Sequence, residues 1–136
     1  MSYIEWSSRH SVCDDRIDAE HREIFLILNA LHDLSLNVPR HPEIEARLVD
    51  LERISSEHFG FEETFMRCIG HRELQQHQSD HRFFTRAVED LHFKFVAGPG
   101  VAAESLEFLM RWFVDHIVGL DRRYASEAAA ARQMAN

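Results

Sequence analysis

The sequence has 136 residues, a size that fits one domain and excludes multidomain enzymes and large barrels. Apolar residues make up 45% and charged residues 28%, with only 5 Gly and 3 Pro, so a disordered or low-complexity chain is excluded too. The formal charge of −8 argues against nucleic acid and anionic membranes as partners. The unusual number is the 10 histidines, which equal the phenylalanines in count.

The N-terminus and the cysteines indicate a cytoplasmic protein. The first residues include an acid, Glu5, and no apolar stretch long enough for a secretory signal. No segment is long and apolar enough to span a membrane. Cys13 and Cys68 lie far apart without a CxxC spacing, so we expect reduced thiols rather than a disulfide framework or a thiolate metal site.

Apolar residues recur at helical spacing in four segments that are separated by helix breakers. The first pattern stops at Pro39, the second before Gly70, and the third at Gly98-Pro99-Gly100. Asp18 is the expected N-cap of the first helix, because its carboxylate can accept from exposed N–H groups. The patterns predict an all-α fold, a single domain over residues 1–136 that forms an antiparallel up-down-up-down four-helix bundle. Its expected elements are an N-terminal arm over residues 1–17 and helices over about 18–36, 43–69, 73–96 and 103–130.

Six polar side chains fall on the apolar stripes that should face the bundle core. A buried imidazole or carboxylate is costly unless it is paired or bound to a metal ion. One such histidine alone would be an ordinary hydrogen-bonded core residue, but two pairs have i, i+4 spacing, which places both side chains on one helix face. The set as a whole therefore indicates a metal site. It consists of His21, His58, Glu62, His77, His81 and His116.

The donor atoms of this set indicate the kind of metal. Nitrogen and oxygen ligands without thiolate suit Fe, Mn, Zn or Cu rather than an iron–sulfur cluster. Six ligands exceed what one tetrahedral zinc ion needs, so a pair of metal ions is implied. Asp121 stays open at this point, because it follows His116 by five residues and lies about 140° away around a regular helix. Spacing alone makes it a surface acid as readily as a ligand.

Five segments, in order along nearly the whole chain, form a more specific pattern than any single pair. They are Trp6 with Ser11-Val12, IDAEHREIF from Ile17, HFGFEETFM from His58, HQSDH from His77, and WFVDHIVGLDRRY from Trp112. With this ordered set the sequence resembles the hemerythrin family, in its single-domain bacterial form, the bacteriohemerythrins. The resemblance implies the same four-helix bundle that the apolar periodicity predicts.

The resemblance also implies a non-haem pair of iron ions (Fe2+/Fe3+) with a solvent-derived oxo or hydroxo bridge. Its implied ligands are His77, His81 and His116 on one iron, His21 and His58 on the other, and Glu62 and Asp121 bridging the two. The second iron would then be five-coordinate. Dioxygen is expected to bind there reversibly as a hydroperoxide, for oxygen storage, delivery or scavenging.

Four apolar residues are placed to form a wall around that open position, although the same residues would also serve as ordinary core. They are Phe25, Phe59, Phe113 and Ile117. A wall of this kind would keep out the water and protons that promote irreversible oxidation. Five neutral imidazoles against two carboxylates also favour reversible binding over oxygenation, because carboxylate-rich sites better stabilise highly oxidised iron.

Two other classes of function stay open. One is a regulatory domain that senses O2, NO or redox state, and the other is an enzyme such as a di-iron peroxidase or NO reductase. The enzyme ranks last, because the sequence offers no catalytic group beyond the ligands. A bundle without metal is the remaining alternative.

The chain departs from its relatives in two places. His71-Arg72 stands where they usually carry Tyr-Pro before the third helix, and Cys13 stands where they commonly carry Gly. Five histidines match no ligand position, and we expect them at the surface or in helix caps. They are His10, His32, His41, His71 and His92.

Overall fold

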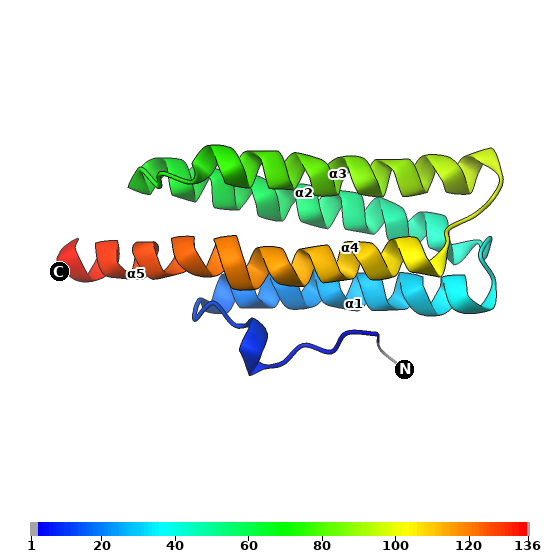
Figure 1. Ribbon diagram of the computed structural model, residues 1–136, viewed down its shortest axis with the longest axis horizontal. Helices are drawn as coiled ribbons and strands as arrows, with labels where there is room; N and C mark the ends of the chain where they lie inside the picture. Colours follow the sequence, from blue (N-terminus) through cyan, green and yellow to red (C-terminus); the bar gives the residue numbers. More distant parts are fainter. Residues whose placement is uncertain (1–2, 136) are drawn as a thin grey trace.

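Four long helical rods pack side by side and antiparallel (Figure 1). The computed structural model describes residues 3–135, except for the side chains of residues 131, 132, 134 and 135. The rods are α1 (Asp15–Asn37), α2 (Glu43–Ile69), α3 (Leu74–Ala97), and a fourth made of α4 (Ala103–His116), the π-helical turn η2 (Ile117–Asp121) and α5 (Arg122–Ala135). The described residues contain no strand. The expected all-α, up-down-up-down four-helix bundle is confirmed.

Each rod buries one apolar stripe and turns its charged residues outward. Leu28, Leu48, Phe84 and Leu106 are fully buried, one from each rod, at 0% exposure. Burying one such side chain is worth about 1.5–3 kcal/mol, which explains why these stripes determine the packing. No helix in the described part of the chain is long and apolar enough to cross a membrane.

Helix α1 begins before the position that the sequence predicted. Its N-cap is Asp14, whose side chain accepts a hydrogen bond from the backbone N–H of Ile17 at 3.0 Å. The expectation that Asp18 caps this helix, and that the arm extends to residue 17, was therefore wrong. Asp18 holds the arm instead, because its carboxylate accepts from the Ser11 hydroxyl at 2.6 Å and the Val12 N–H at 2.9 Å.

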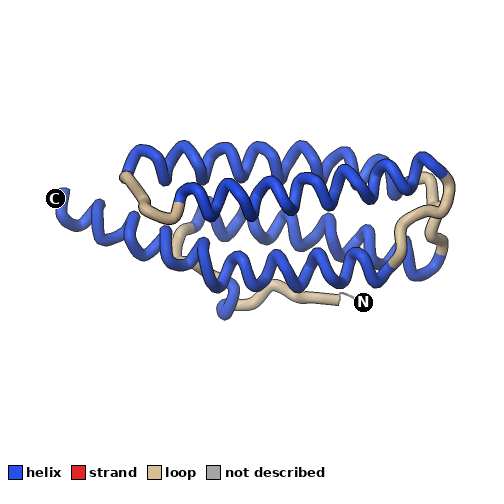
Figure 2. Tube along the Cα trace, turned by 45° about the horizontal axis from the view of Figure 1, so that its top comes forward, coloured by secondary structure: helices blue, strands red, loops and turns tan. Residues whose placement is uncertain are grey.

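The N-terminal arm runs along the outside of the bundle (Figures 1 and 2). A short 3-10 turn, η1 (Ser8–His10), lies within it. Asn29 of α1 fixes the arm through three hydrogen bonds, accepting from Tyr3 and Ile4 N–H at 3.1 and 3.2 Å and donating to the Ile4 carbonyl at 2.6 Å. Figure 2 also shows that α5 extends beyond the ends of the neighbouring helices.

The cysteines lie at the surface and do not bridge. Both Cys13 and Cys68 are exposed free thiols. Cys13 has a φ of 62°, in the left-handed region that glycine adopts most readily. Gly70 ends α2 in the same region with a φ of 67°, as its place after the second stripe predicts.

Gly100 is the glycine whose replacement we expect to cost most. Its φ is 86°, and a Cβ there would lie 2.5 Å from the carbonyl oxygen of Pro39, which also accepts from the Val101 N–H at 3.1 Å. Gly100→Ala should lower the free energy of unfolding by about 1–3 kcal/mol. Gly60→Ala is the matched control, because nothing lies within 4 Å of a Cβ in the middle of α2. It should stabilise by up to about 1 kcal/mol in the same denaturant titration, and equal effects of the two variants would contradict this interpretation.

Candidate metal centre

The structure brings all seven candidate ligands together in the bundle interior. Each of the four rods contributes at least one of them, and none is more than 4% exposed. They are His21 from α1, His58 and Glu62 from α2, His77 and His81 from α3, His116 from α4 and Asp121 from η2.

The seven side chains form two overlapping groups, in each of which one possible ligand atom per residue lies within 4.8 Å of all the others. The larger group is Glu62, His77, His81, His116 and Asp121, and the smaller is His21, His58, Glu62 and Asp121. Both carboxylates belong to both groups. The arrangement therefore offers two metal positions with two shared carboxylates, one with three imidazoles and one with two.

The two oxygens of Asp121 face different groups. Its Oδ1 lies 3.0 Å from Nε2 of His116, and its Oδ2 lies 3.1 Å from Nε2 of His21. Glu62 Oε1 contacts Nε2 of His58 and lies 3.7 Å from Nε2 of His21. Asp121, whose two oxygens are divided between the groups, is therefore placed to bridge two ions.

The π-helical turn η2 explains how Asp121 reaches the centre. In a regular α-helix its side chain would lie about 140° away from that of His116. A π turn is wider and closes between residues i and i+5, so it puts these two residues on one face. The local backbone thus resolves the ambiguity that helical spacing left open for this residue.

The inner atoms of the cluster have no partners outside the cluster. Nε2 of each of the five candidate histidines and both oxygens of Glu62 and Asp121 are buried without a hydrogen bond to any other described residue. Buried polar atoms in native proteins are almost always satisfied, because an unmet donor or acceptor is costly. A donor set of imidazole nitrogens and carboxylate oxygens that all face inward fits metal ions, and fits iron among them.

Three further carboxylates hold the histidine rings from outside, and the sequence analysis missed them. Each accepts a hydrogen bond from the Nδ1 of a candidate ligand on a neighbouring rod. The pairs are Glu20 with His58 at 2.6 Å, Glu63 with His81 at 2.7 Å, and Asp80 with His116 at 3.4 Å. Such contacts fix the tautomer and ring orientation, so Nε2 is presented to the interior.

Burial and the carboxylates act in opposite directions on the histidine pKa values. Burial alone lowers the pKa of His58, but Glu62 and Glu20 outweigh it and raise that pKa to about 10. Burial is likewise outweighed at His116, where Asp121 raises the pKa to about 9. Metal ions bind neutral imidazole, so binding here must displace protons.

The four expected wall residues are all buried against or near the centre. The ring of Phe113 packs edge-on against His21 at 5.6 Å between centroids, and Phe25 packs against Phe113 at 5.7 Å. Phe59 stacks on His81 at 4.0 Å and lies 5.8 Å from His58, so it contacts both groups. The fourth, in η2, is Ile117, which is 0% exposed.

Three of the other histidines are buried, and for His32 and His71 the expectation of a surface or cap role was wrong. His10, His32 and His71 are each 5% exposed. His10 does have a capping role, since its Nδ1 accepts from a backbone N–H of the arm at 3.1 Å. The other two are buried because carboxylates on the fourth rod pair with them, Glu107 with His32 at 3.2 Å and Glu127 with His71 at 2.6 Å.

The remaining two histidines have the peripheral roles that we expected. His41 accepts from the N–H of Glu43 at 3.1 Å and so caps the start of α2. His92 is half-buried and joins α3 to α2 by hydrogen bonds to Glu52 at 2.9 Å and Glu45 at 3.2 Å. Neither belongs to the metal-binding groups.

Comparisons with known proteins agree with this geometry. Residues 14–128 match the family model described as the Hemerythrin HHE cation binding domain. The chain is 31% identical to the bacteriohemerythrin of Clostridium acetobutylicum, covering 88% of this chain and 96% of that one, and 31% identical to that of Stenotrophomonas maltophilia, covering 96% and 84%. A crystal structure of wild-type hemerythrin superposes with a TM-score of 0.84 at 29% identity, covering 92% of this chain and 97% of the other.

Removing one of the outer carboxylates should weaken metal binding, although all seven candidate ligands remain in place. We expect Glu63→Ala to lower metal affinity by about 10–100-fold, because the His81 ring loses the hydrogen bond that orients it. Competition against a chelator measures this. The control is Glu57→Ala on the same helix, whose side chain is 70% exposed and pairs with Arg53. Equal affinities of the two variants would contradict the orienting role.

The metal-free protein should lose stability as the pH rises. A histidine with a raised pKa stabilises the fold fully below its ordinary value of 6.5, and this contribution disappears as the pH passes its folded value, about 10 for His58 and about 9 for His116. The lowered pKa values of His77 and His81 change the free energy of unfolding only below about pH 6.5, so they do not affect its trend in the alkaline range. Denaturant titrations at a series of pH values test this trend.

The metal-loaded protein is the control for that titration and should show the opposite slope in acid. Protons compete with metal for the imidazoles, so its stability should fall as the pH drops. A metal-free protein whose free energy of unfolding stays constant from neutral pH to pH about 10 would contradict the assignment of the raised pKa values.

Proposed function

This chain belongs to the hemerythrin family, and from that membership we propose that it binds dioxygen reversibly at a pair of iron ions. The observation that carries the proposal is the division of seven buried ligands into two groups that share both carboxylates. Relatives of similar length and fold are bacteriohemerythrins, which supports the same conclusion. Storage, delivery and scavenging of oxygen are all compatible with a binding domain of this kind.

The ligands would divide unequally between the ions. We assign His77, His81 and His116 to one ion, His21 and His58 to the other, and Glu62 and Asp121 to both. The position with two imidazoles has one protein ligand fewer than its neighbour. We therefore place the opening for dioxygen on the side of His21 and His58.

The protein's own residues determine what happens at that opening. When bound, a ferrous pair would supply the electrons that reversible dioxygen binding requires. Phe113 and Phe25 lie on the side of His21 and keep water away from it. The two carboxylates partly neutralise the charge of the ions, and the neutral imidazoles add none, which favours binding over deeper oxidation.

Anaerobic loading with ferrous iron tests the proposed function. We expect about two iron ions per chain, and a new visible absorption band when oxygen is admitted. The band should disappear when oxygen is removed and return when oxygen is readmitted. Metal analysis and absorption spectra over several cycles provide the measurement.

Two histidine variants provide matched comparisons for this test. His58→Ala removes one of the two imidazoles at the oxygen side and should abolish the reversible band. His92→Ala removes a histidine that contacts only α2 carboxylates at the periphery and should leave the band unchanged. An iron-loaded wild-type protein that oxidises in air without any reversible band would exclude oxygen carriage.

A further inference from the structure

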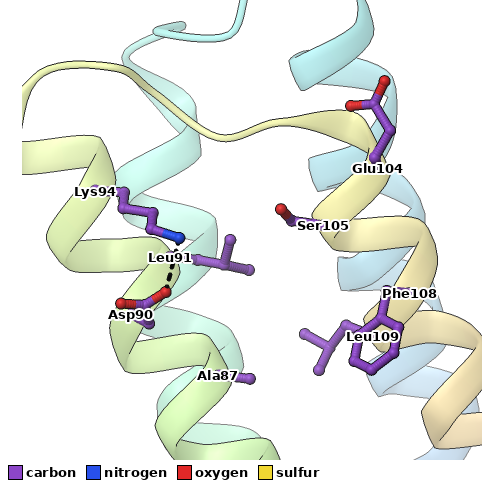
Figure 3. A pocket seen from close by; sticks show the side chains of 8 residues that line it. All are labelled: Ala87, Asp90, Leu91, Lys94, Glu104, Ser105, Phe108 and Leu109. Carbon is purple, nitrogen blue, oxygen red and sulfur yellow. Dashed lines mark ion pairs between the residues drawn. The ribbon is translucent and has the colours of Figure 1, made fainter.

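An open cleft of about 340 Å3 lies between α3 and α4, and none of its lining residues is a candidate ligand. Figure 3 shows Leu91 reaching from α3 toward α4, with Phe108 and Leu109 on the opposite wall. The polar lining residues lie around these apolar side chains. The full lining is Ala87, Asp90, Leu91, Lys94, Glu104, Ser105, Phe108 and Leu109.

A series of aromatic rings connects this cleft with the metal centre. Phe108, which is 53% exposed, packs against Phe83 with 6.4 Å between ring centroids. Phe83 packs against Trp112 at 5.6 Å. Trp112 is half-buried and stacks in parallel on His116, with 5.2 Å between centroids and 10° between planes. The series therefore runs from an exposed ring to a candidate ligand.

The other candidate ligands pack against rings that are buried or farther away. His81 also has a stacked neighbour, Phe59, but that ring is only 3% exposed and reaches Trp112 only through buried Phe84. His77 packs against Tyr124, which is 0% exposed. Trp6 lies 6.5 Å from His21 in a tilted rather than stacked arrangement. At His116, by contrast, a stacked ring leads through one tilted and one edge-on contact to exposed rings.

We propose that the cleft binds a quinol and that electrons tunnel from it through the contacts of Phe108, Phe83 and Trp112 to His116, which would reduce the iron pair after it has been oxidised. This inference rests on the proposed function, because an oxygen-binding iron pair that has lost its electrons must be reduced before it can bind oxygen again. His116 belongs to the group with three imidazoles. Electrons would therefore enter on the side away from the oxygen position.

The chemistry of the cleft favours a neutral aromatic donor. Its apolar walls accept a flat ring, and its volume of about 340 Å3 suits a small molecule. Lys94 is paired with Asp90 at 3.0 Å, while Glu104 has no ion-pair partner among the described residues. The lining therefore has a net negative charge that repels anionic donors. A quinol is uncharged, and its hydroxyl groups can donate hydrogen bonds to Glu104 and Ser105.

The reaction balances without any covalent change in the protein. The two O–H bonds of the quinol break, its two C–O bonds become the carbonyls of a quinone, and two electrons and two protons are released. One electron goes to each of two ferric ions. The protons pass to the Glu104 carboxylate at the edge of the cleft and from there to water.

Anaerobic stopped-flow reduction of the diferric protein, with menadiol as the probe, tests the proposal. The reduction rate should saturate with menadiol concentration, because the donor binds before it reacts. Phe108→Ala should raise the half-saturating concentration about tenfold and also lower the limiting rate, because Phe108 is both a wall of the cleft and the first ring of the path. Trp112→Leu should lower the limiting rate and leave the half-saturating concentration unchanged, a division that a purely structural role would not produce.

Binding can be measured apart from reduction. Menadione cannot reduce the diferric protein, and calorimetry should show that it binds saturably and is weakened by Phe108→Ala. Phe93→Ala is the matched control, because Phe93 is a 71% exposed ring on α3 that does not line the cleft. Dithionite needs no cleft and should reduce wild type and Phe108→Ala at equal rates. If Trp112→Leu fails to retain iron, Phe83→Leu tests the same path.

The outcomes separate this inference from the function on which it rests. The proposed quinol site would be overturned if the reduction rate increased linearly with menadiol concentration, or if wild type and Phe108→Ala had equal half-saturating concentrations. Neither result would affect the proposal of reversible oxygen binding. Saturable menadiol reduction in a protein without a reversible oxygen band would overturn oxygen carriage and leave the cleft supported.

Discussion

The structure depends on one constraint, the burial of five imidazoles and two carboxylates whose inner nitrogen and oxygen atoms face only one another in the bundle core. Each unmet buried polar atom costs about 1–3 kcal/mol, and charged atoms cost more. The contacts of Asp121 with His116 and His21 offset only part of this cost, in a domain whose whole stability is about 5–15 kcal/mol. Metal ions that bind these atoms would remove that cost, so the free energy of metal binding here contributes directly to folding.

The fold meets this constraint with two devices, one in the backbone and one in the side chains. The wider turn η2 rotates Asp121 into line with His116, so that its oxygens reach both groups. Outer carboxylates then orient three rings, and Glu20 is an example because it fixes His58 from a different rod. Nδ1 of His21 has no such partner among the described residues, and aromatic packing against Phe113 holds this ring instead.

The sequence predicts most of this centre, and its failures have physical reasons. The helices follow from apolar periodicity, and the histidines stand out because they occupy apolar positions. Asp121 could not be placed, because the π turn breaks the periodicity on which the argument relied. Glu20, Glu63 and Asp80 were missed because each pairs with a ring on another rod. Each does directly precede or follow a candidate ligand in the chain, and that signal could have revealed them.

The unequal division of the ligands gives the two sides of the centre different surroundings. On the side of His21, where we propose the oxygen position, Phe25 and Phe113 are buried and pack against each other and the imidazole. On the side of His116, the stacked Trp112 leads to exposed rings between α3 and α4. A reductant that reached the oxygen position would need an opening that also admits water and protons, which promote irreversible oxidation. Electron entry through the opposite side lets the wall stay closed, because electrons can pass through ring contacts that molecules cannot.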